Sequence, residues 1–218
     1  MGGVSGSGTR VLPMFPLGSV LVPHQVLPLH VFEPRYRALT EACLSADQRF
    51  GVVLIERGHE VGGGDVRFGT GTVARIVESG RLEDGGWVLS AVGEQRFRIR
   101  SWLAEEPYPS AEVELLDGDA PAAGMPTPDE LSGRDEVERA LARVAALVAE
   151  LGVAPPPEAI RLDPDPVRAS WEAAAWAPIG PLDRQRVLEL DATAARLAEL
   201  GDLLAGVIEV LAHRLAGS

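Results

Sequence analysis

The sequence predicts a mixed α+β protein, in which a β-rich N-terminal part is followed by a helical C-terminal part. Between residues 10 and 116, short runs of strand composition recur, separated by glycine, proline or charged turns. After a segment rich in proline and glycine, apolar residues recur at helical spacings up to the C-terminus. We therefore predict a flexible tail at 1–9, a β-rich unit at 10–116, a linker at 117–128 and a helical unit at 129–218.

Strands are predicted where β-branched and aromatic residues cluster between turn residues. In RFRIRSW, Phe97 and Ile99 alternate with arginines, as a half-buried strand requires. The DGG at 84–86 suits a tight hairpin, and GHEVGGGD at 58–65 indicates a polar, glycine-rich loop. The predicted strands are Arg10–Phe15, Val26–Val31, Phe50–Glu56, Gly71–Val77, Trp87–Val92, Gln95–Trp102 and Ala111–Leu116.

One helix is predicted inside the β-rich unit, over Pro34–Ala46, because proline suits the first turn of a helix. Tyr36, Leu39, Cys43 and Leu44 fall roughly along one face of this helix, which is therefore expected to pack on the core. The position of Cys43 on that face indicates a buried, inert thiol rather than a nucleophile.

The helices of the C-terminal part are predicted from capping residues and apolar stripes. Asp165 and Pro166 suit the start of one helix, Pro178 suits its end, and Asp191 suits the N-cap of the last helix. The stripes expected to be buried are Val137, Leu141, Val144, Val148 and Leu151 in the first helix, and Leu197, Leu200, Leu204, Val207, Ile208, Leu211 and Leu215 in the last.

Charge and composition exclude several classes of function. The net charge is −12, with 11 arginines against 14 carboxylates in residues 1–116 and 9 against 18 in residues 117–218. Such an acidic surface repels phosphate groups, so neither nucleic acid nor a membrane is a predicted partner. All 20 basic residues are arginine. The sequence therefore lacks the lysine of a P-loop and the lysine of a Ser–Lys catalytic dyad.

The sequence also predicts a cellular location. The opening MGGVSGSG has neither the charged nor the apolar region of a secretory signal. No run of about eighteen apolar residues indicates a transmembrane helix. Cys43 is the single cysteine, so neither an internal disulfide nor a cysteine-based zinc site is expected. We therefore predict a cytoplasmic protein.

The stretch LPMFPLGSVLVPHQVLPLHVFEPRY resembles the start of the N-terminal domain of Lon proteases. GTVARI at 71–76 is similar to the central strand of that family, and residues 93–116 are similar to its next hairpin. The helical segment 181–200 follows in the same order. The opening pattern is carried by Leu12, Pro13, Pro16, Leu17, Pro23, Pro28, Leu29 and Phe32.

The resemblance implies a PUA-like β-barrel followed by a C-terminal α-helical bundle. It also implies contact with protein substrates, which this region makes in the full protease. The ATPase and Ser–Lys peptidase modules of that protease have no match in this sequence. The resemblance therefore implies a stand-alone bacterial substrate-binding-domain protein that is not an enzyme and needs no cofactor.

The spacing of His30 and Glu33 invites a metal interpretation, because two ligands three residues apart can share a helix face. Prolines on either side indicate extended chain instead, so no metal is predicted. Glu33 is expected to interact with the N-terminus of the helix that follows. A small-molecule or hydrolytic site in a groove between barrel and bundle, built from His30, Glu33 and Arg35, stays an alternative.

RNA binding is a weaker alternative, because PUA-like barrels of other families bind RNA. Arg96, Arg98 and Arg100 would share one strand face and form the basic stripe. The preferred interpretation is a solvated face, paired with Glu112 and Glu114 on the next strand.

The predicted function is that of a non-catalytic protein- or peptide-binding module. Segments stiffened by proline lose little entropy on ordering and suit preformed contact surfaces. The predicted partners are unfolded or apolar protein segments; a protease or chaperone is a further candidate, and a homodimer is left open. The predicted contact residues are Phe32, Glu33, Arg35, Tyr36, Trp87 and Trp102.

Overall fold

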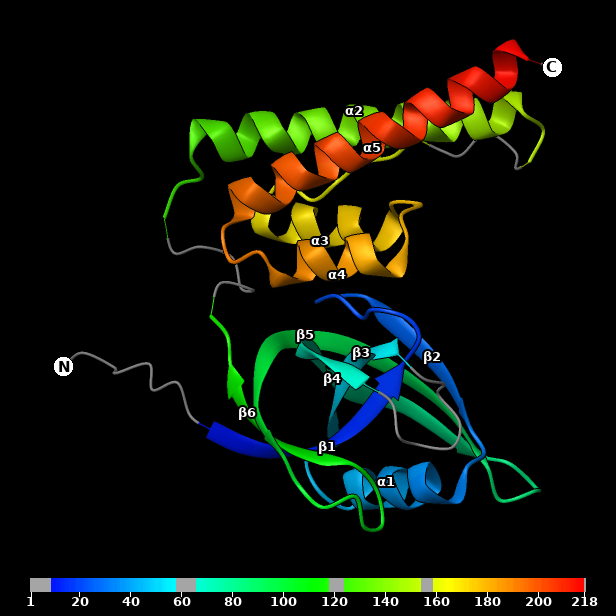
Figure 1. Cartoon of the computed structure of the whole chain (residues 1–218), viewed down its shortest axis with the longest axis vertical. Helices are drawn as coiled ribbons and strands as arrows, with labels where there is room; N and C mark the ends of the chain where they lie inside the picture. Colours follow the sequence, from blue (N-terminus) through cyan, green and yellow to red (C-terminus); the bar gives the residue numbers. More distant parts are fainter. Residues whose placement is uncertain (1–8, 58–65, 118–123, 154–158, 218) are drawn as a thin grey trace. The chain divides into compact units, whose positions relative to one another are not determined.

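The structure is a computed structural model that describes residues 9–57, 66–117, 124–153 and 159–217. These residues form two compact units, one before and one after the segment 118–123. Within the described residues, the first unit has six strands and one helix, and the second has four helices (Figure 1). The mixed α+β class is therefore confirmed. The elements of the first unit are β1 (Thr9–Leu17), β2 (Val26–Val31), α1 (Pro34–Leu44), β3 (Arg49–Arg57), β4 (Val66–Arg81), β5 (Trp87–Trp102) and β6 (Ser110–Leu115).

The strands pair in the order β2-β5-β4-β3-β1-β6, and β6 also pairs with β5. β1 and β3 run parallel, and the other pairs are antiparallel. β5 is 16 residues long, so one of its edges pairs with β2 along Trp87–Val92 and with β6 along Phe97–Trp102. The pairings therefore run in a ring through five strands. Among the described residues, β2 has no strand partner on its second edge.

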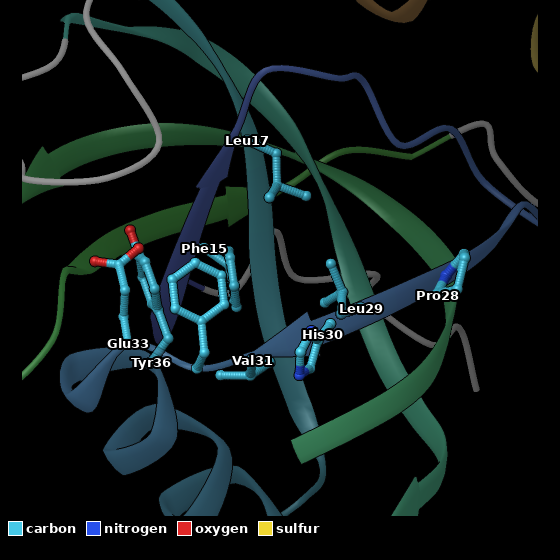
Figure 2. A pocket seen from close by; sticks show the side chains of 9 residues that line it. Phe15, Leu17, Pro28, Leu29, His30, Val31, Glu33 and Tyr36 are labelled. Atoms are coloured by element: carbon cyan, nitrogen blue, oxygen red, sulfur yellow. The ribbon is translucent and has the colours of Figure 1, made fainter. Parts of the chain in front are cut away.

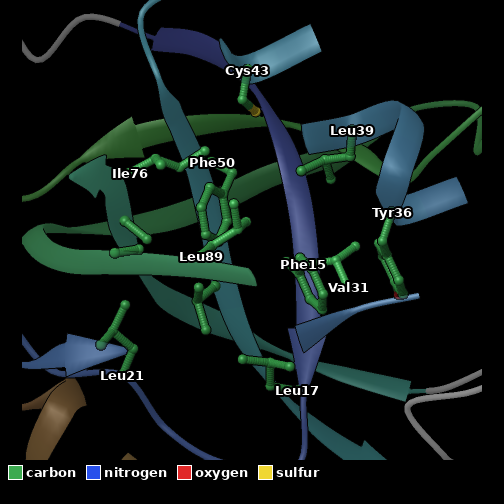
Figure 3. Packing of buried hydrophobic residues seen from close by; sticks show 13 residues of the cluster. Phe15, Leu17, Leu21, Val31, Tyr36, Leu39, Cys43, Phe50, Ile76 and Leu89 are labelled. Carbon is green, nitrogen blue, oxygen red and sulfur yellow. The ribbon is translucent and has the colours of Figure 1, made fainter. Parts of the chain in front are cut away.

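Two hydrophobic clusters lie on opposite faces of β1, β3 and β4. Successive residues of a strand point to opposite faces, so Met14 belongs to one cluster and Phe15 to the other. The buried cluster in Figure 3 comprises Phe15, Leu17, Leu21, Val31, Tyr36, Leu39, Cys43, Phe50, Val52, Ala74, Ile76, Leu89 and Ala91. The second comprises Leu12, Met14, Val53, Val73, Phe97, Ala111 and Val113.

Helix α1 covers the first of these clusters. Pro34 begins it, where a missing N–H costs no helical hydrogen bond. Tyr36, Leu39 and Cys43 are buried, and Leu44 packs against the same cluster. The predicted core-facing side of this helix is therefore confirmed.

The second unit consists of α2 (Pro128–Glu150), α3 (Pro166–Trp176), α4 (Pro181–Glu189) and α5 (Thr193–Ala216). Thr127 and Glu130 form a reciprocal capping box at the start of α2. Asp165 caps α3 by accepting a hydrogen bond from the amide of Val167, as expected.

The last helix, α5, differs from the prediction in two respects. Its N-cap is Ala192 rather than Asp191, and no side chain caps it. Its stripe is fully buried only at Leu197, Leu200 and Leu204, and the later apolar residues of the stripe are partly exposed. No helix in the described ranges is long and apolar enough to cross a membrane.

The prediction that the arginines of β5 form a solvated face is wrong at Arg96. Arg96 is fully buried, and one guanidinium nitrogen lies 3.5 Å from the carbonyl oxygen of Asp117. Arg100 pairs with Glu114, as expected.

The two strands predicted between residues 87 and 102 are one strand, β5. The predicted loop at 58–65 and nearly all of the predicted tail lie outside the described residues.

Candidate functional site

A cavity of about 230 Å³ opens in the first unit, where β1, β2 and the start of α1 meet (Figure 2). All of its lining residues belong to the proline-rich N-terminal stretch that carries the family resemblance. They are Phe15, Leu17, Pro28, Leu29, His30, Val31, Phe32, Glu33 and Tyr36.

The floor of the cavity is part of the hydrophobic core. The rings of Phe15 on β1 and Tyr36 on α1 stack with their centroids 4.2 Å apart and their planes 12° apart. Leu17 and Val31 are buried members of the same cluster. Because packed core side chains hold little free space and move little, the floor is preformed.

One wall of the cavity is the edge of β2. Pro28, Leu29, His30 and Val31 follow one another in this strand, and all four line the cavity. Successive side chains point to opposite faces, so a space bordered by all four lies along an edge of the strand. The other edge of β2 is paired with β5. The cavity therefore lies along the edge that has no strand partner among the described residues.

The charged side chains at the rim contact each other. Arg35 Nε lies 3.2 Å from Glu33 Oε2, and the guanidinium carbon of Arg35 lies 4.6 Å from the centre of the Tyr36 ring. Glu33 occupies the N-cap position of α1 but makes no side-chain capping hydrogen bond. The expected contact with the helix N-terminus is thus replaced by an ion pair.

The arrangement suits the binding of an apolar side chain. The described lining residues include no serine, threonine or cysteine that could act as a nucleophile. Across the described part of the chain, no three His, Cys, Asp or Glu side chains are grouped closely enough to hold a metal ion. Burial, aided by the charge of Asp47, raises the pKa of the Cys43 thiol to about 12. The buried Cys43 therefore stays a thiol at neutral pH.

Three of the six predicted contact residues, Phe32, Glu33 and Tyr36, line the cavity. Phe32 is 58% exposed and offers apolar surface at the rim, next to His30, whose ring lies 6.1 Å away. Tyr36 is buried in the floor. Arg35 does not line the cavity but reaches it through its ion pair with Glu33.

The other two predicted contact residues lie elsewhere, at the two ends of β5. Trp87 is half-buried and packs against the cluster of Figure 3. Trp102 is 36% exposed and stacks with Arg67, whose guanidinium carbon is 4.4 Å from the ring centre. Arg67 also pairs with Glu105 at 2.8 Å. A contact role for either tryptophan stays a prediction.

Phe15 and Leu29 line the cavity but are not among the predicted site residues. Both lie in the stretch with the family pattern, and Leu29 is part of the pattern itself. An apolar residue in a strand is explained equally well by core packing, so composition alone cannot separate core from site. The separation depends on which edge of β2 is paired.

A family model described as the ATP-dependent protease La (LON) substrate-binding domain matches residues 11–206. The chain therefore belongs to the LON substrate-binding domain family, and the resemblance drawn from its motifs is confirmed. The match is to the substrate-binding domain, not to the protease or ATPase modules of Lon.

Among curated relatives, Lon protease 2 of Herpetosiphon aurantiacus is 31% identical over 214 residues, which are 95% of this chain and 25% of that protein. Lon protease of Escherichia coli (strain K12) is 30% identical over 207 residues, 92% of this chain and 25% of the relative. The chain thus spans about a quarter of the length of these relatives.

Two solved structures share the fold. The Lon N-terminal domain protein from Xanthomonas campestris has a TM-score of 0.64 and 26% identity, and the match covers 88% of this chain and 96% of that one. The N-terminal domain of Mycobacterium avium complex Lon protease has a TM-score of 0.64 and 20% identity, with coverages of 90% and 98%. These likenesses support the PUA-like fold expected from the resemblance.

Proposed function

We propose that this chain is a non-catalytic protein-binding module, which recognises exposed apolar segments of other proteins in the cavity beside β2. The observation that carries the proposal is the cavity itself, with a floor of packed core side chains and an opening along a strand edge. The family description supports it, because the substrates of a protease are proteins.

The size of the cavity favours a side chain over a cofactor. Its volume of about 230 Å³ is below the range of roughly 300–1,000 Å³ that holds drug-sized ligands. Burying one large apolar side chain contributes about 1.5–3 kcal/mol, so a single anchor gives weak binding. Phe32, exposed at the rim, adds apolar surface that would strengthen the contact.

The small-molecule or hydrolytic alternative requires His30, Glu33 and Arg35 to converge on one ligand. Glu33 and Arg35 instead engage each other, and Arg35 does not line the cavity. These contacts favour the binding module. A protease or chaperone partner, a homodimer and a cytoplasmic location stay predictions.

A peptide array tests the proposal, followed by fluorescence polarisation with the peptides that bind. We expect apolar peptides to bind selectively, without ATP or metal. Phe32→Ala should weaken that binding roughly five-fold, since truncating an aromatic contact residue typically costs more than about 1 kcal/mol. Val77→Ala is the matched control, because Val77 is 48% exposed but does not line the cavity.

Two results would contradict the proposal. One is an array in which apolar peptides bind no better than polar peptides. The other is equal binding by wild type and Phe32→Ala, provided that Leu29→Asp also binds normally. Leu29→Asp places a carboxylate in the cavity wall, so it should abolish binding of any apolar anchor.

A further inference from the structure

The unpartnered edge of β2 is where the cavity meets backbone rather than side chains. Every second residue of an antiparallel strand directs its N–H and C=O toward one neighbour, and the residues between direct theirs the other way. The groups that β2 presents to the cavity can therefore be assigned from its pairing with β5.

The pairing shows which residues face β5. The amide of Gly93 donates to the carbonyl oxygen of Gln25 at 2.9 Å, so the position of Gln25 bonds toward β5. The register of β2 on β5 continues from there without a shift, with Val26 opposite Val92 and Val31 opposite Trp87. By alternation, Leu27, Leu29 and Val31 bond toward β5, and Val26, Pro28 and His30 face the other edge.

Pro28 agrees with this assignment. Proline has no N–H, and within sheets it occupies positions whose N–H would face away from the ladder. Its presence at the free edge also interrupts the row of donors there, which is how edge strands avoid uncontrolled pairing. Of the cavity-lining residues of β2, His30 is then the one that directs both an N–H and a C=O toward the cavity edge.

We infer that a client segment binds in extended conformation and forms a single antiparallel β-bridge with His30. One residue of the client donates a backbone hydrogen bond to His30 and accepts one from it. The inference rests on the proposed function. Toward Pro28 the pairing loses its next donor, because proline has a C=O but no N–H. In the other direction β2 ends at Val31 and α1 begins at Pro34.

The bridge also determines which client side chain enters the cavity. A residue paired with His30 directs its side chain to the same face as the exposed His30 side chain. Its neighbour in the client directs its side chain to the face of Leu29 and Val31, which is the face of Phe15 and Tyr36 (Figure 2). The anchor is therefore the residue next to the bridged one, and the bridged residue itself cannot be proline.

Substitutions at His30 separate the backbone from the side chain. His30→Ala keeps the N–H and removes the imidazole, whereas His30→Pro removes the N–H. His30→Pro should fold, because the position faces the same edge as Pro28 and makes no bond to β5. The probe is the fluorescein-labelled peptide GSGVFVGSG, used unmodified and in versions N-methylated at one valine, at the other valine or at phenylalanine. Fluorescence polarisation measures the binding of each peptide.

We expect His30→Pro to bind the peptide roughly ten-fold more weakly than His30→Ala, because both lack the imidazole and only the proline lacks the N–H. N-methylation of the valine that is bridged to His30 should weaken binding to a similar extent. N-methylation of phenylalanine should be tolerated, because the phenylalanine amide points away from β2. The peptide should also slow hydrogen exchange at the His30 amide of wild type.

The possible failures are distinguishable. If wild type does not bind the unmodified peptide or any apolar peptide of the array, the proposed function is wrong and the inference with it. The bridge is wrong and the proposed function stands if Phe32→Ala weakens binding while two other results hold. His30→Pro would bind the peptide as tightly as wild type does, and wild type would bind the N-methylated peptides as tightly as the unmodified peptide. Equal loss in His30→Ala and His30→Pro also overturns the bridge, because the imidazole would then be the contact.

Discussion

Glu94 on β5 lies between the side chains of Arg49 on β3 and Arg75 on β4. Its carboxylate is 2.7 Å from Arg49 Nε and 2.5 Å from Arg75 Nε. Burial alone would raise the pKa of Glu94, but the hydrogen bonds and charges of the two arginines outweigh it and hold the pKa below its usual value. The ionised form therefore stabilises the fold.

The lowered pKa of Glu94 predicts an acid-sensitive contribution to stability. A carboxylate with a lowered folded pKa contributes fully above its unfolded value, near 4.5, and the contribution is lost as pH falls through the folded pKa. Glu94→Gln should lower the free energy of unfolding by about 1 kcal/mol at pH 7 and by much less at pH 3. Urea denaturation at both pH values measures this difference.

Glu78→Gln is the control for that measurement, because Glu78 is an exposed carboxylate on β4. It should change stability little at either pH. An equal loss for Glu94→Gln at pH 7 and pH 3 would show that the arginine contacts contribute nothing through charge.

Gly93 and Arg96 differ from their predicted environments because of contacts with distant segments. One predicted strand ended at Val92 and the next began at Gln95, yet Gly93 lies inside β5. A Cβ at this position would lie 2.3 Å from the carbonyl oxygen of Val22, so glycine is required by close approach of backbone and not by a turn. Arg96 was expected in solvent and is buried. Both depend on segments distant in sequence, which no local pattern encodes.

At the level of elements, β2 has the features of a protected edge strand. It is six residues long, and Pro28 removes the central donor of its free edge. The strand therefore keeps an open edge beside an apolar cavity without offering a continuous ladder to other chains. The same feature limits how long a bound client segment can pair.

Pro28→Val restores the missing donor and should make the edge competent for longer pairing. We expect concentration-dependent self-association of this variant, measured by sedimentation velocity, together with tighter peptide binding. The double variant Val26→Pro/Pro28→Val is the control, because Val26 faces the same edge and returns a proline to it. A Pro28→Val variant that matches wild type in mass and in peptide binding would argue against an accessible edge.

Local patterns predicted most elements because their causes are local. The bounds of β2 agree with the prediction, and α1 begins at Pro34 as expected. Asp165 caps α3 through the amide of a residue two positions ahead. The cap expected at Asp191 is absent because the last helix begins one residue later, at Thr193, and a one-residue shift is beyond the resolution of sequence patterns.

For the whole molecule, the net charge of −12 opposes binding to polyanions. The burial of Arg96 and the pairing of Arg100 with Glu114 reduce the basic stripe that an RNA site on β5 would need. Charge and structure therefore agree in disfavouring the RNA-binding alternative.

A labelled single-stranded RNA should show no electrophoretic shift with this protein, even at about 50 mM salt, where phosphate contacts are strongest. Arg98→Glu should leave this result unchanged. A shift that weakens with added salt and disappears in Arg98→Glu would instead establish an RNA site on β5.

The sequence alone determined the mixed α+β class, the core-facing side of α1, the cap of α3 and the family, because these depend on spacing and motifs within short segments. Three of the contact residues predicted from sequence, Phe32, Glu33 and Tyr36, line the cavity, and their contact role stays a prediction. Only the tertiary structure decided that the site is a cavity along the edge of β2. That outcome depends on β5 pairing with one edge of β2 and not the other, and on β1 and α1 supplying a floor of core side chains. Pairing between segments far apart in the chain is a non-local choice, which residue patterns within a single segment do not record.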